Sequence, residues 1–334
     1  MIGTSDIREQ GYKDPLLVKV MKEHGFDEIP LYKHRPPEQM AQRRRWSDLA
    51  KLRDGPLNPA RTAIDDIERA AAQIKQLAHE IGADDVGIAR LTPIMIRRGL
   101  DLLHDYAICM IVSEDYAQAL EGPRATEQEA CNAYVRCAEI ATRMAAHIRS
   151  LGYPALAHHN GACDIQAIPA MIAAGLGEFG KHGSLVHPEF GASHRPGIVT
   201  TTMPLAVDSP LVFGVQDTCL HCNLCSNNCP ADAIPREEFT ITEGIRRWVT
   251  DVEKCYVFSR LRAEYCHICV DVCPYVHMAN GDPAKRNLYK LFTGMRKKLG
   301  YKSPTRFARE YEPLEPVVVE VSPESKAPLL LVSM

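Results

Sequence analysis

Cys219-Leu-His-Cys222-Asn-Leu-Cys225-Ser-Asn-Asn-Cys229-Pro230 is the stretch that decides the fold of this 334-residue chain. Two, two and three residues separate its four cysteines, and a proline follows the last of them. A second group, Cys266-His-Ile-Cys269-Val-Asp-Val-Cys273-Pro274, repeats the two- and three-residue steps, and Cys255 stands alone between the groups. Eight cysteines therefore lie in one short region, in two related half-motifs.

This spacing is typical of thiolate ligands to iron–sulfur clusters. The pattern C-x2-C-x2-C-x3-C-P is that of bacterial two-cluster ferredoxins, in which the fourth cysteine binds the neighbouring cluster. It predicts two [4Fe–4S] clusters with crossed ligands. The first takes Cys219, Cys222, Cys225 and Cys273, and the second takes Cys229, Cys255, Cys266 and Cys269. Ten residues rather than two separate Cys255 from Cys266, so Cys255 departs from the simple pattern.

Zinc and disulfides are the alternatives for these cysteines. Structural zinc sites use paired C-x2-C steps and rarely add a third cysteine at the same step followed by Cys-Pro. Disulfides require an oxidising compartment, for which the sequence gives no signal. The remaining cysteines are interpreted as free, buried thiols; they are Cys109, Cys131, Cys137 and Cys163.

Composition describes an ordinary globular protein. Hydrophobic residues make up 46% and charged residues 24%, and the net charge of −3 gives no basic surface for nucleic acid or anionic lipid. The first residues, Met1 to Asp6, lack the apolar run of a secretion signal, and Arg43-Arg44-Arg45 precedes Trp46-Ser-Asp rather than an apolar run. No apolar stretch approaches the length of a membrane span. We expect a cytoplasmic protein that binds neither nucleic acid nor membrane.

Hydrophobic periodicity predicts a mixed α/β (α+β) core. We expect four regions: an extended, proline-rich arm at 1–60, the core at 61–213, a ferredoxin-like domain at 214–282, and a helix and tail at 283–334. Within the core the pattern predicts helices at 61–81, 126–151 and 165–174, the second ending at Gly152. Strands are predicted at 85–89, 106–112, 153–158, 197–203 and 211–215. A basic helix is expected near 285–298.

The glycines Gly175, Gly177 and Gly180 fit G-x-G-x-x-G but do not predict a dinucleotide site. Such a site follows a strand and opens a helix, with an acidic residue about 20 positions further on. Here the glycines follow a helix-like segment, and Gly197-Ile-Val199 stands where the acid should be. They indicate instead a loop that something approaches closely, or a plain helix end and turn.

Three segments together resemble the corrinoid-dependent reductive dehalogenases, which share a core with epoxyqueuosine reductase. They are Ala174 to Gly191, Arg195-Pro-Gly-Ile-Val-Thr-Thr-Thr-Met-Pro-Leu205, and Phe213-Gly-Val before the cysteines. Tyr134, in a helix that ends Ile148-Arg-Ser-Leu-Gly-Tyr153, and Asn160 match the same pattern. The resemblance covers roughly residues 60–280 and, more weakly, residues 34–54.

The resemblance implies a nitroreductase-like core that binds cobalamin without covalent attachment, packed on a ferredoxin-like domain with two [4Fe–4S] clusters. It implies Tyr134 as proton donor, Arg195 as the cation beside it, and Asn160 as a polar contact in the pocket. Gly175, Gly177, Gly180, Lys181 and His187 are the expected corrinoid contacts. The alternative interpretation is a core tyrosine, a surface arginine, and a lysine that caps the preceding helix.

The residue types suit this chemistry. Cleaving a carbon–halogen bond reductively leaves a carbon that must be protonated. A tyrosine is a weak acid at neutral pH, and a guanidinium, which keeps its charge in proteins, stabilises the phenolate. We therefore expect a cytoplasmic, non-respiratory dehalogenase of a small aromatic organohalide.

Two other functions stay open. One is an epoxyqueuosine-reductase-like enzyme acting on tRNA, which the net charge disfavours. The other is an iron–sulfur electron carrier, or a reductase of a non-halogenated substrate. The expected partners are a small-molecule substrate and a separate electron donor, namely a ferredoxin, a flavodoxin or a flavin reductase, because the chain ends soon after the cysteines. A homodimer also stays open.

Overall fold

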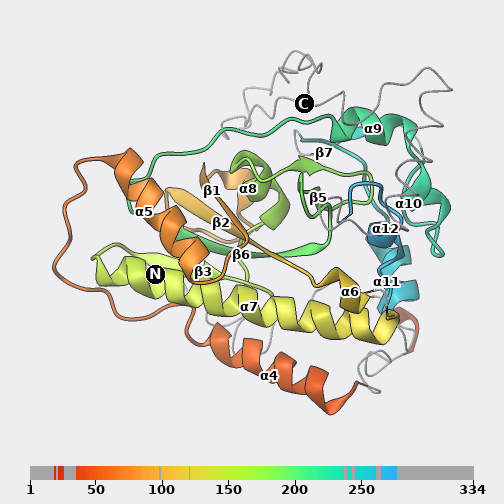
Figure 1. The fold of residues 1–334 in the computed structure, drawn as a ribbon, viewed down its shortest axis with the longest axis horizontal. Coiled ribbons are helices and arrows are strands. Elements are labelled where there is room, and N and C mark those ends of the chain that lie inside the picture. The colour runs from red at the N-terminus through yellow and green to blue at the C-terminus, as the bar shows by residue number, and fades with distance from the viewer. Residues whose placement is uncertain are drawn as a thin grey trace. The chain divides into compact units, whose positions relative to one another are not determined.

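Two units make up the described part of the chain, which comprises, in this computed structural model, residues 19, 22–25, 35–97, 99–119, 121–236, 239–242, 245–260 and 265–276 (Figure 1). The first unit contains residues 19, 35–175 and 194–209, and the second contains residues 22–25, 176–193 and the described residues from 210 to 276. Residues 176–193, which the sequence analysis assigned to the core, thus belong with the cysteines. The expected helix at 285–298 and the tail lie outside the described residues.

A four-stranded sheet forms the centre of the first unit. Its strands are β1 (Asp85–Arg90), β2 (Tyr106–Ser113), β3 (Ala155–His158) and β6 (His194–Thr201), in the order β1-β2-β6-β3. Every neighbouring pair is antiparallel. The strands predicted at 85–89, 106–112, 153–158 and 197–203 are confirmed. The all-antiparallel pairing makes the unit α+β rather than a parallel α/β fold.

Two helices cover one face of the sheet (Figure 1): α5 (Ile67–Glu80) and the long α7 (Pro123–Ser150). Alternate strand residues point to the same face. Ile88, Met110 and Val199 accordingly share one buried cluster with Ile74 of α5 and Met144 of α7. The helix predicted at 126–151 is confirmed, and Gly152, at φ 84°, ends it in the left-handed conformation.

The opposite face packs against α8 (Ala167–Ala173), which confirms the helix predicted at 165–174. Gly87 precedes Ile88 on β1 and therefore points away from α5 and α7. A β-carbon at Gly87 would lie only 2.0 Å from the carbonyl oxygen of Ala174. The glycine thus lets this helix end approach the sheet. A short 3-10 helix (Pro93–Met95) and α6 (Tyr116–Ala119) complete the unit.

Two predicted features differ from the structure in this unit. The arm expected to be extended contains α4 (Pro37–Ala50), which packs along α7 (Figure 1). Proline at its first position favours helix initiation rather than extension. The helix predicted to begin at 61 begins at Ile67, because the side chain of Asp66 caps it by accepting from the N–H of Arg69 at 2.9 Å.

Short elements make up the second unit. A hairpin of β4 (Glu178–Phe179) and β5 (Leu185–Val186) precedes α9 (Val215–His221) and α10 (Leu224–Asn227); β7 (Thr240–Thr242) pairs with β8 (Ile245–Arg247), and α11 (Val252–Arg260) and α12 (Ile268–Asp271) follow. The strand predicted at 211–215 is wrong. The N–H groups of Phe213 and Val215 donate to the carboxylate of Glu178 at 2.6 and 3.0 Å rather than to a strand.

No helix within the described ranges combines the length and the apolar character needed to cross a membrane.

Candidate functional site

Tyr134 and Arg195 meet in the first unit. Tyr134 lies on α7, and Arg195 lies near the start of β6, opposite Val112 of β2. The Cζ atom of Arg195 lies 5.1 Å from the centroid of the Tyr134 ring, so the guanidinium covers the ring face. Trp46 of α4 packs edge-on against the same ring, with centroids 5.6 Å apart and planes at 71°. The predicted pairing of a tyrosine with a cation is therefore present as a stack on the ring.

Glu114 holds Arg195 in place. Its carboxylate lies 2.7 Å from Nη2 of Arg195, and the two side chains are only 3% and 13% exposed. A buried ion pair this close fixes the guanidinium, because separating the charges would leave both without water. No sequence motif marks Glu114. Its signal in the sequence is an acidic residue that follows the predicted strand 106–112 after Ser113.

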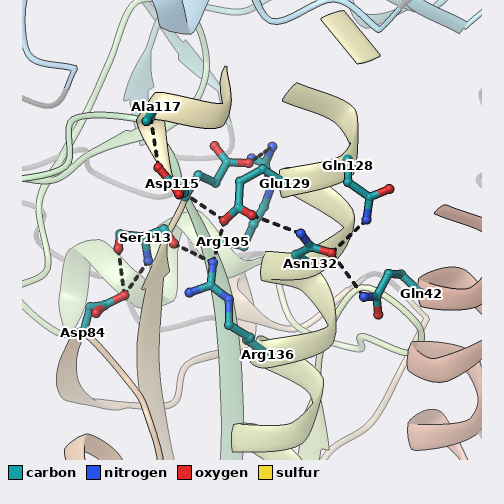
Figure 2. Close-up of polar contacts among 11 residues, drawn as sticks. Gln42, Asp84, Ser113, Asp115, Ala117, Gln128, Glu129, Asn132, Arg136 and Arg195 are labelled. Carbon is teal, nitrogen blue, oxygen red and sulfur yellow. Dashed lines mark hydrogen bonds and ion pairs between the residues drawn. The ribbon is translucent and has the colours of Figure 1, made fainter. Parts of the chain in front are cut away.

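Ser113 and Asp115, the neighbours of Glu114 in the chain, are anchored to α7 and to Asp84, the residue before β1 (Figure 2). Glu129 accepts from the N–H of Asp115 at 2.9 Å and from Arg136 at 2.6 Å, and Arg136 also donates to the carbonyl of Ser113 at 3.0 Å. Asp84 accepts from the N–H and hydroxyl of Ser113. These bonds leave the loop that carries Glu114 little freedom to move.

The same polar cluster ties α7 to α4 (Figure 2). Asn132 donates to Glu129 at 3.2 Å and accepts from Gln128 at 2.9 Å and from Gln42 of α4 at 3.2 Å. Because α4 also carries Trp46, these bonds help to hold the indole against Tyr134.

Asn160 lies in the turn that joins His159 to Ala162 after β3, where it is exposed. It forms no hydrogen bond within the described part of the chain. The turn comes close to α4, because a β-carbon at Gly161 would lie 2.8 Å from the carbonyl oxygen of Trp46. Asn160 therefore lies in a turn beside α4, which carries Trp46, and its role in the pocket stays a prediction.

The glycines expected to contact a corrinoid are closely approached by the chain itself. A β-carbon at Gly175 would lie 2.5 Å from the carbonyl oxygen of Ser209, and one at Gly177 would lie 2.2 Å from that of Val186. One at Gly180 would lie 2.8 Å from the ring of His182. Gly175 also ends α8, at φ 76°. Close packing within the chain therefore explains why glycine stands at these positions.

His187 and Lys181 are likewise engaged within the second unit. The Nδ1 atom of His187 accepts from the N–H groups of Glu189 and Phe190, and its ring stacks on Phe190 at 4.6 Å. The amine of Lys181 donates to Asn223, within the first cysteine motif, at 2.7 Å. Contacts within the chain account for these five residues, and their role as corrinoid contacts stays a prediction.

The cysteines of the second unit fall into two groups of interacting thiols. The thiols whose charges act on Cys219 are Cys273, Cys222 and Cys225. Those acting on Cys269 are Cys266, Cys225, Cys255 and Cys229. Apart from the link through Cys225, these neighbours are the two crossed sets that the spacing predicted. Cys255, the ligand that departs from the simple pattern, lies on α11 with the second set.

Burial raises the pKa of the Cys225 thiol to about 11 and that of the Cys219 thiol well above its ordinary value. Such thiols become thiolates when cations bind them. Backbone N–H groups already point at two sulfurs, from Lys181 to Cys219 at 3.4 Å and from Ala233 to Cys229 at 3.3 Å. This donor set fits iron–sulfur clusters, whose ligands are thiolates that accept hydrogen bonds. Within the described residues, no three His, Cys, Asp or Glu side chains are placed to hold a single metal ion.

The four other cysteines are free, as predicted. Cys109, Cys131 and Cys137 are buried, and Cys163 is partly buried. Burial raises the pKa of Cys131 to about 11 and that of Cys137 to about 12. Cys131 and Cys137 therefore stay protonated at neutral pH.

Comparison with known proteins agrees with the cysteine pattern and with the resemblance. The 4Fe-4S dicluster domain family matches residues 218–276. The tetrachloroethene reductive dehalogenase of Desulfitobacterium hafniense is 32% identical over 192 residues, which is 53% of this chain and 34% of that protein. The epoxyqueuosine reductase of Synechococcus sp. is 36% identical over 121 residues, 31% of this chain and 33% of that protein. The chain thus spans about a third of the length of these curated relatives.

A solved structure extends the match over most of the chain. The catabolic reductive dehalogenase NpRdhA, in complex with 3-bromo-4-hydroxybenzoic acid, superimposes with a TM-score of 0.73 and 28% identity, covering 90% of this chain and 46% of that one. The sequence matches and the shared fold point to the same group of proteins. The chain is a relative of the reductive dehalogenases, with epoxyqueuosine reductase as a second relative.

Proposed function

We propose that the chain is a cytoplasmic, non-respiratory, corrinoid-dependent iron–sulfur reductase that removes halide from a small aromatic organohalide. The observation that carries the proposal is the stack of Arg195 on Tyr134, backed by buried Glu114, in a chain whose relatives are reductive dehalogenases. The partly buried ring of Tyr134, packed against buried Trp46, offers aromatic surface to an aromatic substrate. The nitroreductase-like character of the core is part of this proposal.

The reaction consumes two electrons and one proton for each halide released. The carbon–halogen bond breaks, the halide leaves, and a new carbon–hydrogen bond forms. Tyr134 gives its hydroxyl proton to the carbon, and Arg195 stabilises the phenolate that results. Glu114 keeps the guanidinium over the ring throughout, because their ion pair is buried. A proton from water restores the tyrosine.

The electrons enter through two [4Fe–4S] clusters held by the eight cysteines of the second unit. Cobalamin, when bound, supplies the cobalt chemistry of carbon–halogen cleavage. A separate ferredoxin, flavodoxin or flavin reductase supplies the electrons. Crossed ligation is supported by the two sets of interacting thiols around Cys219 and Cys269.

The test is halide release by the anaerobically purified protein, loaded with iron, sulfide and cobalamin and reduced with a low-potential chemical donor. Halogenated phenols and benzoates are offered, and halide and the dehalogenated product are measured in equal amounts. Tyr134→Phe should lower the turnover about 10²–10⁴-fold, because it removes the proton donor. Failure to release halide from any of them, while another substrate is reduced, would overturn the proposal.

Tyr106→Phe is the matched control. Tyr106, on β2, also lies under an arginine, since Cζ of Arg90 is 4.9 Å from its ring centroid. That arginine pairs with Asp105 on the surface, where the two side chains are 59% and 48% exposed. Tyr106→Phe should therefore keep full turnover. Equal losses in both variants would show that Tyr134 acts through packing alone.

Epoxyqueuosine reduction is the second candidate, favoured by the 36% identity to the Synechococcus enzyme over 121 residues. The net charge of −3 disfavours a tRNA substrate. The same loaded protein should therefore fail to retain tRNA in a low-salt shift assay. Retention of tRNA together with absence of halide release would select this second function.

A further inference from the structure

Lys181 is a buried lysine in the second unit. It follows β4 in the loop that leads to β5, and its side chain is only 1% exposed. Lysine is among the residues least often buried completely, because removing an ammonium from water is costly unless other groups replace the water. The residues around Lys181 must therefore supply that stabilisation.

Among the described residues, the polar and ring contacts of Lys181 lead to the first cysteine motif and to an aromatic ring. Its amine donates to Oδ1 of Asn223, the residue after Cys222, at 2.7 Å. The amine also lies 5.5 Å from the centroid of the Trp248 ring, within reach of a cation–π interaction. Its backbone N–H donates to the sulfur of Cys219 at 3.4 Å. The loop and the motif are thus joined through both backbone and side chain.

The partners of the amine hold its charge without cancelling it. An amide oxygen and an indole face are both neutral, and no carboxylate of the described residues forms an ion pair with Lys181. Burial lowers the pKa of the Lys181 amine, and the nearby thiols of Cys219, Cys225 and Cys222 act in the opposite direction. The positive charge is therefore directed at one set of cysteines.

We propose that Lys181 is a positioning residue for electron transfer, which raises the reduction potential of the cluster held by Cys219, Cys222, Cys225 and Cys273. Reduction adds one negative charge to the cluster and its thiolates, and net charge and burial are among the factors that set such potentials. A buried cation stabilises the reduced form more than an exposed one, because water does not screen it. The inference rests on the cluster assignment in the proposed function but not on its substrate.

The test is a redox titration of the cluster-loaded protein, followed by EPR without substrate. Lys181→Met keeps the length of the side chain and removes its charge. At a fixed poise, the ratio of reduced to oxidised cluster should fall about tenfold, which is a downward shift of about 59 mV for a one-electron couple. The reduction potential of the other cluster, followed by its own EPR signal, should shift less.

Lys254→Met is the matched control. Lys254 adjoins Cys255 in the sequence, but its side chain is 56% exposed and lies near Asp251 at 3.8 Å. Water and that carboxylate screen its charge, so its removal should leave both potentials nearly unchanged. An equal shift in the two lysine variants would show that net charge alone matters and would overturn the proposal.

Two further variants separate charge from packing. Lys181→Arg retains the charge and should restore most of the potential. Asn223→Asp is nearly isosteric, places a carboxylate against the amine, and should lower the potential while the lysine stays in place. Iron and sulfide analysis checks that each variant keeps its clusters. If Lys181→Met loses iron, the potential of the Asn223→Asp variant tests the proposal in its place. Unchanged potential in a fully loaded Lys181→Met protein would overturn the proposal, even if the wild type releases halide. A shift would support it even if no halide is released.

Discussion

Buried His159 should make the first unit less stable in mild acid than at neutral pH. Its side chain is 2% exposed, and its Nδ1 atom accepts from the N–H of Gly161 at 3.1 Å in the turn that carries Asn160. Burial, with a smaller effect of the nearby Arg53 charge, lowers the pKa of His159 to about 4. The folded protein therefore holds this imidazole neutral, whereas the unfolded chain protonates it near pH 6.5.

The direction of the effect follows from proton binding. Between about pH 6.5 and 4 the unfolded state binds more protons at His159 than the folded state, so the free energy of unfolding falls as the pH falls. With these two pKa values, acidification from about pH 7.5 to 5 removes about 2 kcal/mol of stability. For a domain of this size that corresponds to a loss of about 4–8 °C in Tm.

The assay compares the wild type with His159→Asn in anaerobic thermal unfolding followed by circular dichroism. The asparagine oxygen can still accept from Gly161, but it does not titrate. The wild type should lose about 2 kcal/mol more than the variant over this pH range. His147→Asn, at an exposed histidine of α7, is the matched control and should behave as the wild type does. Parallel loss of stability in the wild type and His159→Asn would refute the argument.

The buried ion pair and the cluster ligands give two further predictions. Glu114→Ala should lower the free energy of unfolding by about 3–5 kcal/mol in denaturant titrations, because it leaves the buried charge of Arg195 without its carboxylate. Asp105→Ala, in the exposed pair with Arg90, should cost less than about 1 kcal/mol, and similar losses in the two variants would contradict this reasoning. Cys219→Ser and Cys273→Ser should alter the same cluster signal in EPR, and Cys229→Ser and Cys266→Ser should alter the other. A shared effect of Cys219→Ser and Cys229→Ser instead would contradict crossed ligation.

The sequence predicted the elements whose residues bury a full face. All four strands of the sheet and the long helix α7 have apolar residues at regular steps, because each packs against the core. Helix α4 was missed for the opposite reason. It buries only Gln39 and Trp46, so its apolar period is too weak to see among the prolines of residues 1–60. The apolar run at 211–215 misled because Glu178 takes the N–H groups that a strand would have paired.

The sequence could predict which residue types form the candidate site but not how they are arranged in space. The resemblance led to Tyr134 and Arg195, and the structure brings these two together. Glu114 was missed, because one acidic residue after an apolar strand carries no motif. Lys181 was expected at a corrinoid or a helix end, yet its amine contacts Asn223, far along the chain. Local patterns cannot reveal such a contact, because it forms only when the loop folds onto the cysteine motif.

Arg195 and Lys181, two largely buried cations among the described residues, are balanced in different ways, and the difference suits different tasks. Arg195 lies 2.7 Å from a buried carboxylate, so the pair is neutral and its main effect is to fix a donor group beside Tyr134. Among the described residues, the amine of Lys181 has a neutral amide and an indole as its partners besides the cysteines, so its charge acts on its surroundings. A neutral pair favours orientation, whereas an unbalanced charge in a low dielectric favours the gain of an electron nearby. A carboxylate added by Asn223→Asp should therefore lower the reduction potential of the cluster near Lys181. Removal of the carboxylate by Glu114→Ala should instead free the side chain of Arg195 to move.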